Sequence, residues 1–248
     1  MKLAELTWPE VDALDRSTVV VIATGSIEQH GAHLPLATDS LLVTSVMEAV
    51  EARLSEKILL TPTVWLGASG HHLAFAGSLS ASFEGYEDSL IQIVENFHAH
   101  GFHKFYIVNG HGGNTEPNGI VCRKLKTRHP EIVIGHSGYF AFLTQATYDA
   151  ILTGSIKGIR HACEAETSLM MHLHPHLVRL EKRRDDGLEV DPPVPGMVFF
   201  FDECTEAGSF GDATHASANK GKVLFDEAVE GLSQALSSLS HGISLQGR

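Results

Sequence analysis

Residues 18–30 of this chain read TVVVIATGSIEQH, a β-branched apolar run that leads directly into a polar loop. The continuous run 18–23 is typical of a strand buried on both faces, as in a parallel sheet covered by helices. A second strand of this kind, 104–108, leads into the glycine-rich sequence NGHGGN at 109–114. Ligand sites in parallel sheets form beyond the carboxyl ends of the strands, so both loops are expected to line one site.

Strand and helix patterns alternate outward from this core. Further strands are predicted at 58–64 and 132–134, and amphipathic helices at 39–54, 85–100 and 116–127. After Tyr139 the pattern is mainly helical, at 139–152, 163–173 and 216–239. This alternation predicts an α/β fold with a mostly parallel sheet covered by helices. Without repeats or linkers, residues 1–248 are expected to form one domain, in which 181–211 is a long loop acting as a lid or subunit contact.

Composition excludes several classes of protein. The 248 residues include 18 Lys+Arg and 30 Asp+Glu, giving a net charge of −12. An acidic chain without basic runs is a poor partner for nucleic acid or an anionic membrane. No stretch approaches the roughly 18 apolar residues of a membrane span, and the first ten residues lack the apolar core of a signal peptide. Three widely spaced cysteines indicate reduced thiols, so we expect a cytoplasmic protein.

The chain contains 16 histidines, and the first loop combines one of them with two acids. Glu28 and His30 are two residues apart, so an extended backbone points both side chains the same way. Asp39 follows at the start of the next helix. Such residues suit zinc, manganese or iron(II). Individually, Asp39 is also a good helix N-cap and His30 a loop hydrogen-bonding residue, but the combination is harder to explain structurally.

Two further segments carry candidate residues. In the second loop, His111 is either a ligand or an exposed residue of a glycine-rich turn, and the glycines allow close approach of the backbone to a ligand. In HACEAETS at 161–168, His161 and Glu164 would share a helical face, being three apart. Glu166 would lie about 200° away from Glu164, on the apolar side. If the whole segment is helical, the two acids have different roles.

Other histidines and motifs carry less weight. His71 and His72, in a Gly/Ser-rich loop, are candidates for lining a substrate pocket. His172, His174 and His176 surround a proline and are interpreted as solvated. The sequence contains no G-x-S-x-G, P-loop, G-x-G-x-x-G or H-E-x-x-H motif. These absences argue against a serine-hydrolase elbow, a phosphate-binding loop, a dinucleotide fold and a metalloprotease helix.

Taken together, these motifs resemble the creatininase family of metal-dependent amidohydrolases over nearly the whole chain. The resemblance is carried by six blocks, LTWPEV at 6–11, GSIEQHGAHLP at 25–35, GSLS at 77–80, NGHGGN at 109–114, HACEAETS at 161–168 and GDATHAS at 211–217. It implies a three-layer α/β sandwich on a mostly parallel sheet. It also implies two divalent metal ions per subunit, with zinc expected and manganese or iron as alternatives.

The resemblance assigns a role to each candidate ligand. Asp39 would bridge the two metals, Glu28 and His111 would complete one site, and His30 plus a further Glu the other. Creatininase proper has that Glu where this chain has Gly113. Glu164 is therefore the predicted fifth ligand, with Glu166 as the alternative and otherwise a catalytic residue that orients a ligand or His161.

The residues and the resemblance together give a hypothesis for the reaction, in which the resemblance places His161 and Ser69 near the substrate. A metal-activated hydroxide would attack the amide carbonyl, and His161 would donate a proton to the departing nitrogen. Backbone N–H groups of Gly112 and Gly113 would hold the developing negative charge. Ser69 and His72 would line the substrate pocket. This chain lacks the active-site tryptophans of creatininase proper, because its tryptophans are Trp8 and Trp65.

Three functions follow as hypotheses. The first is hydrolysis of a small cyclic amide or formamide. The second is cleavage of a precursor peptide, as in mycofactocin maturation by a relative in this family. The third is metal binding without catalysis, which predicts closed coordination without a water position. The resemblance further implies a homo-oligomer, a hexamer, with the apolar run 197–201 as a contact or an internal strand.

Overall fold

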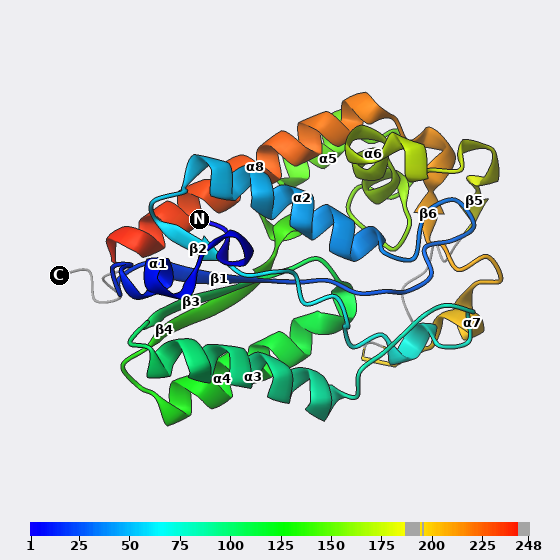
Figure 1. The fold of residues 1–248 in the computed structure, drawn as a ribbon. Helices are drawn as coiled ribbons and strands as arrows, with labels where there is room; N and C mark the ends of the chain where they lie inside the picture. Colours follow the sequence, from blue (N-terminus) through cyan, green and yellow to red (C-terminus); the bar gives the residue numbers. More distant parts are fainter. Residues whose placement is uncertain (187–193, 195, 243–248) are drawn as a thin grey trace.

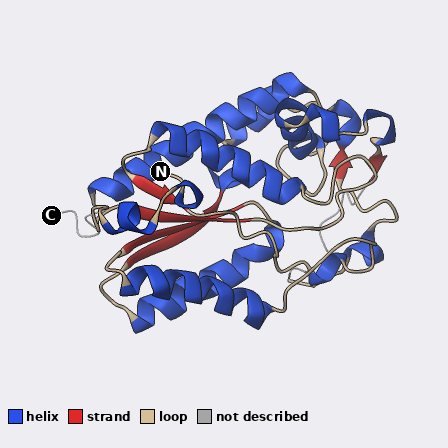
Figure 2. Ribbon diagram, in the orientation of Figure 1, coloured by secondary structure: helices blue, strands red, loops and turns tan. Residues whose placement is uncertain are grey.

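The computed structural model describes residues 1–186, 194 and 196–242. Its centre is a four-stranded sheet with the order β2-β1-β3-β4, in which every neighbouring pair is parallel (Figures 1 and 2). The strands are β1 (Val19–Thr24), β2 (Ile58–Leu60), β3 (Lys104–Asn109) and β4 (Val133–Gly138). The predicted α/β class and parallel sheet are therefore confirmed.

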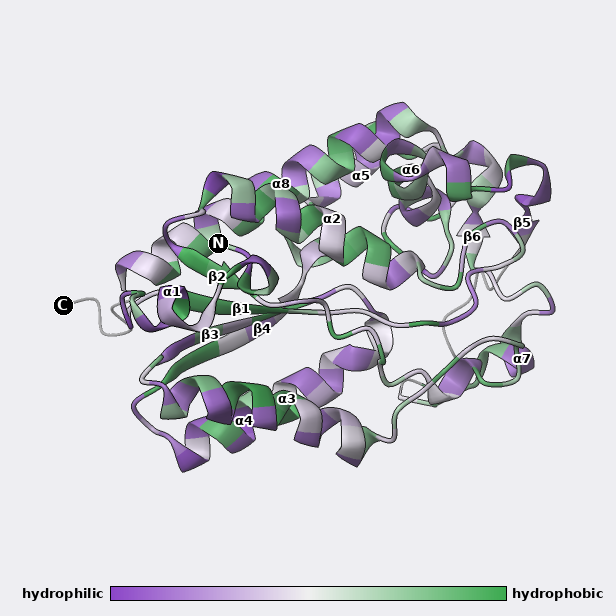
Figure 3. Cartoon of the chain, in the orientation of Figure 1, coloured by the Kyte–Doolittle hydropathy of each residue, from purple (hydrophilic) through white to green (hydrophobic). Residues whose placement is uncertain are grey.

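Strand β1 lies inside the sheet and contributes side chains to a hydrophobic core on each face. Val19, Val21 and Ala23 belong to one buried cluster, whereas Val20 and Ile22 belong to the other. This division follows from the alternation of side chains along a strand. Figure 3 shows the central strands as a largely apolar layer between the helices. The continuous apolar run in the sequence reflects burial on both faces.

Helices cover both faces, which gives the three layers seen in Figure 1. One layer contains α2 (Thr38–Arg53), α5 (Gln145–Ile151), α6 (Glu164–Leu173) and α8 (Ala218–His241). The other contains α3 (Phe83–Ala99) and α4 (Thr115–Arg128). Helices α6 and α8 pack very closely at Gly221, where a Cβ would lie 1.9 Å from the carbonyl oxygen of Ser168.

The structure departs from the predicted elements in several places. Strand β2 ends at Leu60 instead of continuing to residue 64, because Pro62 has no N–H to give to the sheet. The chain still follows the sheet, with Val64 donating to Ala23. The predicted helix 139–152 is divided into a 3-10 turn at Tyr139–Phe142 and the shorter α5.

The segment predicted as a long loop, 181–211, contains short elements in its described part. Strand β5 (Asp185–Asp186) pairs antiparallel with β6 (Gly211–Asp212), and α7 (Phe201–Cys204) lies between them in sequence. Residues 187–193 and 195 of this predicted loop lie outside the described residues. The run 197–200 is not a strand. The remaining α-helix, α1 (Trp8–Asp12), lies near the chain start. No helix in the described ranges is long and apolar enough to cross a membrane.

Candidate metal centre

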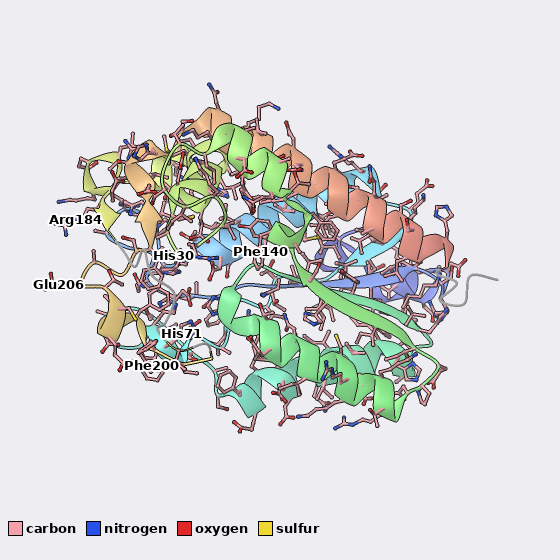
Figure 4. All side chains as sticks on the ribbon, turned by 180° about the vertical axis from the view of Figure 1, so that it is seen from behind. His30, His71, Phe140, Arg184, Phe200 and Glu206 are labelled. Atoms are coloured by element: carbon pink, nitrogen blue, oxygen red, sulfur yellow. The ribbon has the colours of Figure 1, made fainter. Side chains whose placement is uncertain are left out.

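Two loops and the first turn of a helix bring acidic and histidine side chains together at the carboxyl end of the sheet. The loop after β1 supplies Glu28 and His30, the loop after β3 supplies His111, and the first turn of α2 supplies Asp39. All four side chains are almost completely buried. Figure 4 shows His30 within this region. The two predicted loops therefore do form one cluster, as the rule for parallel sheets requires.

Glu28, Asp39 and His111 form one half of the cluster. Nδ1 of His111 lies 3.2 Å from Oε1 of Glu28 and 3.0 Å from Oδ2 of Asp39. The loop is fixed by Asn109, whose side chain accepts from the His111 N–H and donates to the His111 carbonyl. The imidazole is thus held with one nitrogen between two carboxylates.

His30, Asp39 and Glu166 form the other half. Nε2 of His30 lies 3.1 Å from Oδ1 of Asp39 and 3.5 Å from Oε2 of Glu166. One potential ligand atom from each of the three residues lies within 4.8 Å of the other two. Asp39 therefore contributes one oxygen to each half, which is the arrangement expected of a bridging carboxylate.

Hydrogen bonds to the far side of each ring leave the inner nitrogen with its lone pair. Nδ1 of His30 donates to the carbonyl of Glu28 at 3.1 Å, and Nε2 of His111 donates to the carbonyl of Ala68 at 3.3 Å. Metal-binding histidines commonly donate their other ring N–H to an oxygen in this way. The inner nitrogens of both rings face carboxylate oxygens, which is the arrangement of ligand atoms around a shared cation.

The electrostatics of the cluster lead to the same conclusion. Burial raises the pKa of Glu166 to about 7. Burial opposes protonation of His30, but the carboxylates of Asp39 and Glu166 raise its pKa to about 10. Oδ2 of Asp39, although close to His111, accepts no hydrogen bond of suitable geometry from the described residues. Buried negative charge and an orphaned carboxylate oxygen fit a divalent cation well.

The predicted ligand Glu164 does not fit these contacts, and Glu166 does. Nζ of Lys220 lies 2.5 Å from Oε1 of Glu164, and the backbone N–H groups of Thr153 and Gly154 donate to the same carboxylate. Glu164 is thus fully partnered away from His30 and Asp39. The reason is that α6 begins only at Glu164, so His161 does not share a helical face with it.

A sharp turn before α6 brings Glu166 to the cluster. Ala162 has a positive φ of 53°, the one non-glycine residue in the described chain with this conformation. Its N–H donates to Oε2 of Glu166 at 2.6 Å. The turn and this hydrogen bond direct the Glu166 carboxylate back toward His30, and the turn is the feature that helical periodicity does not predict.

Gly113 leaves no space for a side chain. A Cβ at this position would lie 2.5 Å from both the Ala68 carbonyl oxygen and Nε2 of His111. At Gly112, by contrast, nothing lies within 4 Å of a Cβ. The vacant ligand position inferred from the sequence is therefore also closed sterically in this chain. Both glycines line the cavity described below.

The residues predicted to bind substrate have different positions. His72 is buried, and its Nε2 lies 3.2 Å from Oε1 of Glu28 while Gln29 donates to its Nδ1 at 3.0 Å. Ser69 is fully buried behind His111, with its hydroxyl 3.2 Å from Nε2 of that ring. Both residues thus support ligand side chains, and His72 also lines the cavity.

His161 lies between the two halves of the cluster. Its Nε2 donates to the Gln29 carbonyl at 2.6 Å, and its Nδ1 lies 3.5 Å from Oε1 of Glu28. Burial lowers the pKa of His161 well below the ordinary value. The ring is therefore neutral near pH 7, with a lone pair at Nδ1.

A cavity of about 300 Å³ opens onto the cluster. Phe201 from α7 stacks on the ring of His72, with centroids 3.9 Å apart. Phe140 and Arg160 also line the cavity. The Arg160 side chain donates to the carbonyl of Ile159 and has no acidic partner among the described residues. The wall thus combines aromatic rings with one cation that is not paired with a protein carboxylate.

Two contributors, Gln29 and Phe201, were not predicted from the sequence, and a third, His71, was expected only to line a substrate pocket. His71 groups with Glu28 and His111 as a possible ligand set, Gln29 holds His72, and Phe201 covers His72 and His161. His71 was detectable as the neighbour of His72 in the same polar loop. No sequence pattern marked Phe201 as a site residue, because its segment reaches the site only through tertiary contacts. Figure 4 shows His71 and Phe140 on opposite sides of this region.

The chain is similar to proteins of one family. The creatininase family model, described as creatinine amidohydrolase, matches residues 4–236. A mycofactocin precursor peptide peptidase from Mycobacterium ulcerans is 32% identical, with 90% of this chain and 83% of that protein covered. Creatinine amidohydrolase from Pseudomonas putida is 28% identical, with 94% and 95% covered.

Solved structures show the same likeness. A crystal structure of creatinine amidohydrolase (creatininase) is 27% identical and superposes with a TM-score of 0.82, covering 95% of this chain and 96% of that chain. Similar creatininase structures include a mutant of Zn-Zn type and a Mn form. Metal-bound relatives thus share this fold.

Proposed function

This chain belongs to the creatininase family, and on that premise we propose that it is a metal-dependent amidohydrolase that cleaves the C–N bond of a small cyclic amide or formamide. The observation that carries the proposal is a buried cluster in which Asp39 contacts His30 through one oxygen and His111 through the other, and which opens onto a cavity. A small substrate is supported by the cavity volume of about 300 Å³.

The cluster has ligands for two divalent ions. Glu28, Asp39 and His111 would hold one, and His30, Asp39 and Glu166 the other. Mixed imidazole and carboxylate donors suit zinc best, with manganese and iron(II) as alternatives. When bound, such ions polarise a carbonyl oxygen and lower the pKa of a coordinated water toward neutrality.

His161 is proposed to move the proton. Because its Nε2–H is held by the Gln29 carbonyl, Nδ1 is the atom that can accept a proton from the attacking water. The same atom can then return the proton to the departing nitrogen, which needs it in order to leave. The low pKa of His161 favours this return. His161 is thus a base first and an acid second, a fuller role than the predicted proton donor.

The remaining groups position the substrate. The glycines at 112 and 113 keep the backbone open to the cavity, so that an N–H there can stabilise negative charge on the carbonyl oxygen. His72 holds Glu28 in place, and Phe201 excludes water from one side. Glu166, predicted as a catalytic residue, is proposed as a ligand.

Cleavage of a peptide is the second candidate. It is supported by the 32% identity to a precursor peptide peptidase. A second hollow of about 650 Å³, lined by Gln29, Phe75, Arg184 and Glu206 among others, lies next to the first through Gln29 and could accept an extended chain. Figure 4 shows Arg184 and Glu206 at this side of the molecule.

Metal binding without catalysis is disfavoured by the cavity. A purely structural site is closed by its ligands, whereas Glu28, Asp39, His111 and Glu166 all line an open space.

One assay separates the candidates. Metal-loaded protein is incubated with a cyclic amide, a formamide and a short peptide, and release of amine is measured for wild type and Asp39→Ala. Loss of the activity toward small amides in the variant is expected. Activity toward the peptide alone would select the second candidate, and metal uptake without any hydrolysis would contradict both.

A further inference from the structure

A second group of metal-ligating side chains lies at the opposite end of the sheet. His98 is in the last turn of α3, and His129 and Glu131 are in the connection between α4 and β4. Strands β3 and β4 begin at this edge, whereas the candidate metal centre follows their carboxyl ends. This group therefore shares no residue with the candidate metal centre.

The three residues converge on one point near the surface. Nε2 of His98 lies 3.1 Å from Oε1 of Glu131, and Nδ1 of His129 lies 3.8 Å from the same oxygen. The ring centroids of the two histidines are 4.5 Å apart. One potential ligand atom from each residue lies within 4.8 Å of the other two. The histidine side chains are 25% exposed, which leaves access for an ion.

In each ring, the nitrogen that points away from Glu131, here called the outer nitrogen, already has a hydrogen-bond partner. Nδ1 of His98 donates to the carbonyl of Phe102 at 3.2 Å, and Nε2 of His129 lies 2.8 Å from Oε2 of Glu95. A carbonyl and a carboxylate oxygen can only accept, so both outer nitrogens carry hydrogen. In the neutral rings, the inner nitrogens then face Glu131 with lone pairs.

The ion pair between His98 and Glu131 leaves Nδ1 of His129 at 3.8 Å from the carboxylate, beyond hydrogen-bond distance. A divalent metal ion between the three residues would bind both inner nitrogens and the carboxylate at once. The second partners, a carbonyl for His98 and a carboxylate for His129, are those that orient metal-binding histidines. The same pattern of outer hydrogen bonds orients His30 and His111 in the candidate metal centre.

We propose that His98, His129 and Glu131 form a second metal site, which binds a zinc-like divalent cation and fastens the end of α3 to the connection before β4. Two imidazoles and one carboxylate favour zinc over magnesium or calcium, which prefer oxygen donors. Three protein ligands leave a position for water. The site adds a link between the end of α3 and the connection before β4, beside the ion pair of His129 with Glu95, so its role is stabilisation of the fold.

The test is metal content after dialysis. Chelator-treated protein is loaded with Zn²⁺, dialysed, and its bound zinc is counted for wild type, His129→Ala, Glu131→Gln and the control His100→Ala. His100 caps the same helix and is exposed, but contributes no side chain to the group. Each of the first two variants is expected to lose one zinc equivalent, and His100→Ala none.

Thermal unfolding supplies a second readout. Added Zn²⁺ should raise the Tm of Asp39→Ala, in which the candidate metal centre is disrupted, and this rise should vanish when Glu131→Gln is added. Equal zinc content in His129→Ala, Glu131→Gln and His100→Ala would overturn the proposal, and so would a Tm rise that survives Glu131→Gln. The three residues would then form only an ion-pair cluster. A failure of the proposal for the candidate metal centre would be seen separately, because Asp39→Ala would then bind as much zinc as the wild type.

Discussion

Glu164 and Glu166 are two residues apart in the first turn of α6, yet their surroundings are opposite. One carboxylate is paired with Lys220, and the other faces His30 inside a buried acidic cluster. Sequence reasoning chose Glu164 as the ligand and kept Glu166 as the alternative, because the sequence alone does not place the start of the helix on which the choice depends. The positive φ of Ala162 sets that start, and it has no signature in hydrophobic periodicity.

Metal content should therefore respond to one carboxylate and not to its neighbour. Glu166→Gln is expected to lose one metal equivalent, since it removes a charged ligand. Glu164→Gln should keep the wild-type content and serves as the matched control. Elemental analysis of dialysed protein provides the measurement. The reverse pattern would restore Glu164 as the ligand.

Glu164 should instead affect stability, with a defined pH dependence. Burial acts to raise the pKa of Glu164, but hydrogen bonds from Lys220 and two backbone N–H groups lower it below the ordinary 4.5. A carboxyl whose pKa is lower in the folded protein stabilises the fold above its unfolded pKa, and this contribution disappears as pH falls through the folded value. At neutral pH, Glu164→Gln is expected to lower the free energy of unfolding by about 1–3 kcal/mol.

Urea unfolding at several pH values tests this expectation. The difference between wild type and Glu164→Gln should stay constant near neutral pH and shrink below about pH 4.5. Glu56→Gln, at an exposed position, should show no comparable difference. A gap that persists unchanged at acid pH would mean that packing, and not charge, is responsible.

The two adjacent glycines of the second loop provide another paired test. Gly113→Ala forces a methyl group against Nε2 of His111 and the Ala68 carbonyl, so His111 must move. Because His111 would then be held in a different orientation, metal affinity is expected to fall by about 10–100-fold. Gly112→Ala has open space and should retain wild-type affinity. Competition with a chromophoric chelator measures both; equal affinities would argue against His111 as a ligand.

At the scale of elements, the strands and most helices could be predicted from periodicity. Strand β1 and helices α2, α3 and α4 lie within two residues of their predicted bounds, because their apolar patterns match the surfaces they bury. The failures have local causes. Pro62 ended β2 early, and the region after Tyr139 forms a 3-10 turn and a short helix separated by the extended residues Leu143 and Thr144.

The close contact between α6 and α8 gives a prediction at this scale. Gly221→Ala would place a Cβ against the backbone of α6, which carries Glu166. Because backbone cannot yield as a side chain does, a loss of about 1–3 kcal/mol in unfolding free energy is expected. In α4, Gly119→Ala meets only the ring of His136 at 3.2 Å and should be close to neutral. Denaturant midpoints compare the two; a neutral Gly221→Ala would show that the helices can separate.

At the scale of the whole molecule, the parallel sheet and the gathering of the two loops were predictable, because both follow from general rules for α/β proteins. The position of α7 was not, since Phe201 reaches the site across a segment without periodicity. Assembly is likewise not encoded in any pattern that acts within one chain.

The exposed apolar residues of the segment before α7 lead to a prediction about assembly. Met197, Val198 and Phe200 are 45%, 84% and 52% exposed. Burying such a surface against another subunit is favourable, so a homo-oligomer, a hexamer by family resemblance, is expected in solution. Light scattering after size exclusion should give several times 26.8 kDa, and Val198→Asp should reduce it. A wild-type species of 26.8 kDa at micromolar concentration would contradict this expectation.

The stacking of Phe201 on His72 has a consequence for how such a protein can diversify. The proposed ligand side chains come from the strand-end loops, α2 and α6, whereas Phe201, which stacks on His72, comes from α7. The residues proposed to bind metal and the residue that covers one side of the cavity therefore lie on separate segments of the chain. We therefore expect exchange of the residues next to Phe201 to change which molecules enter, while Phe201 itself must stay to support His72 and, through it, Glu28.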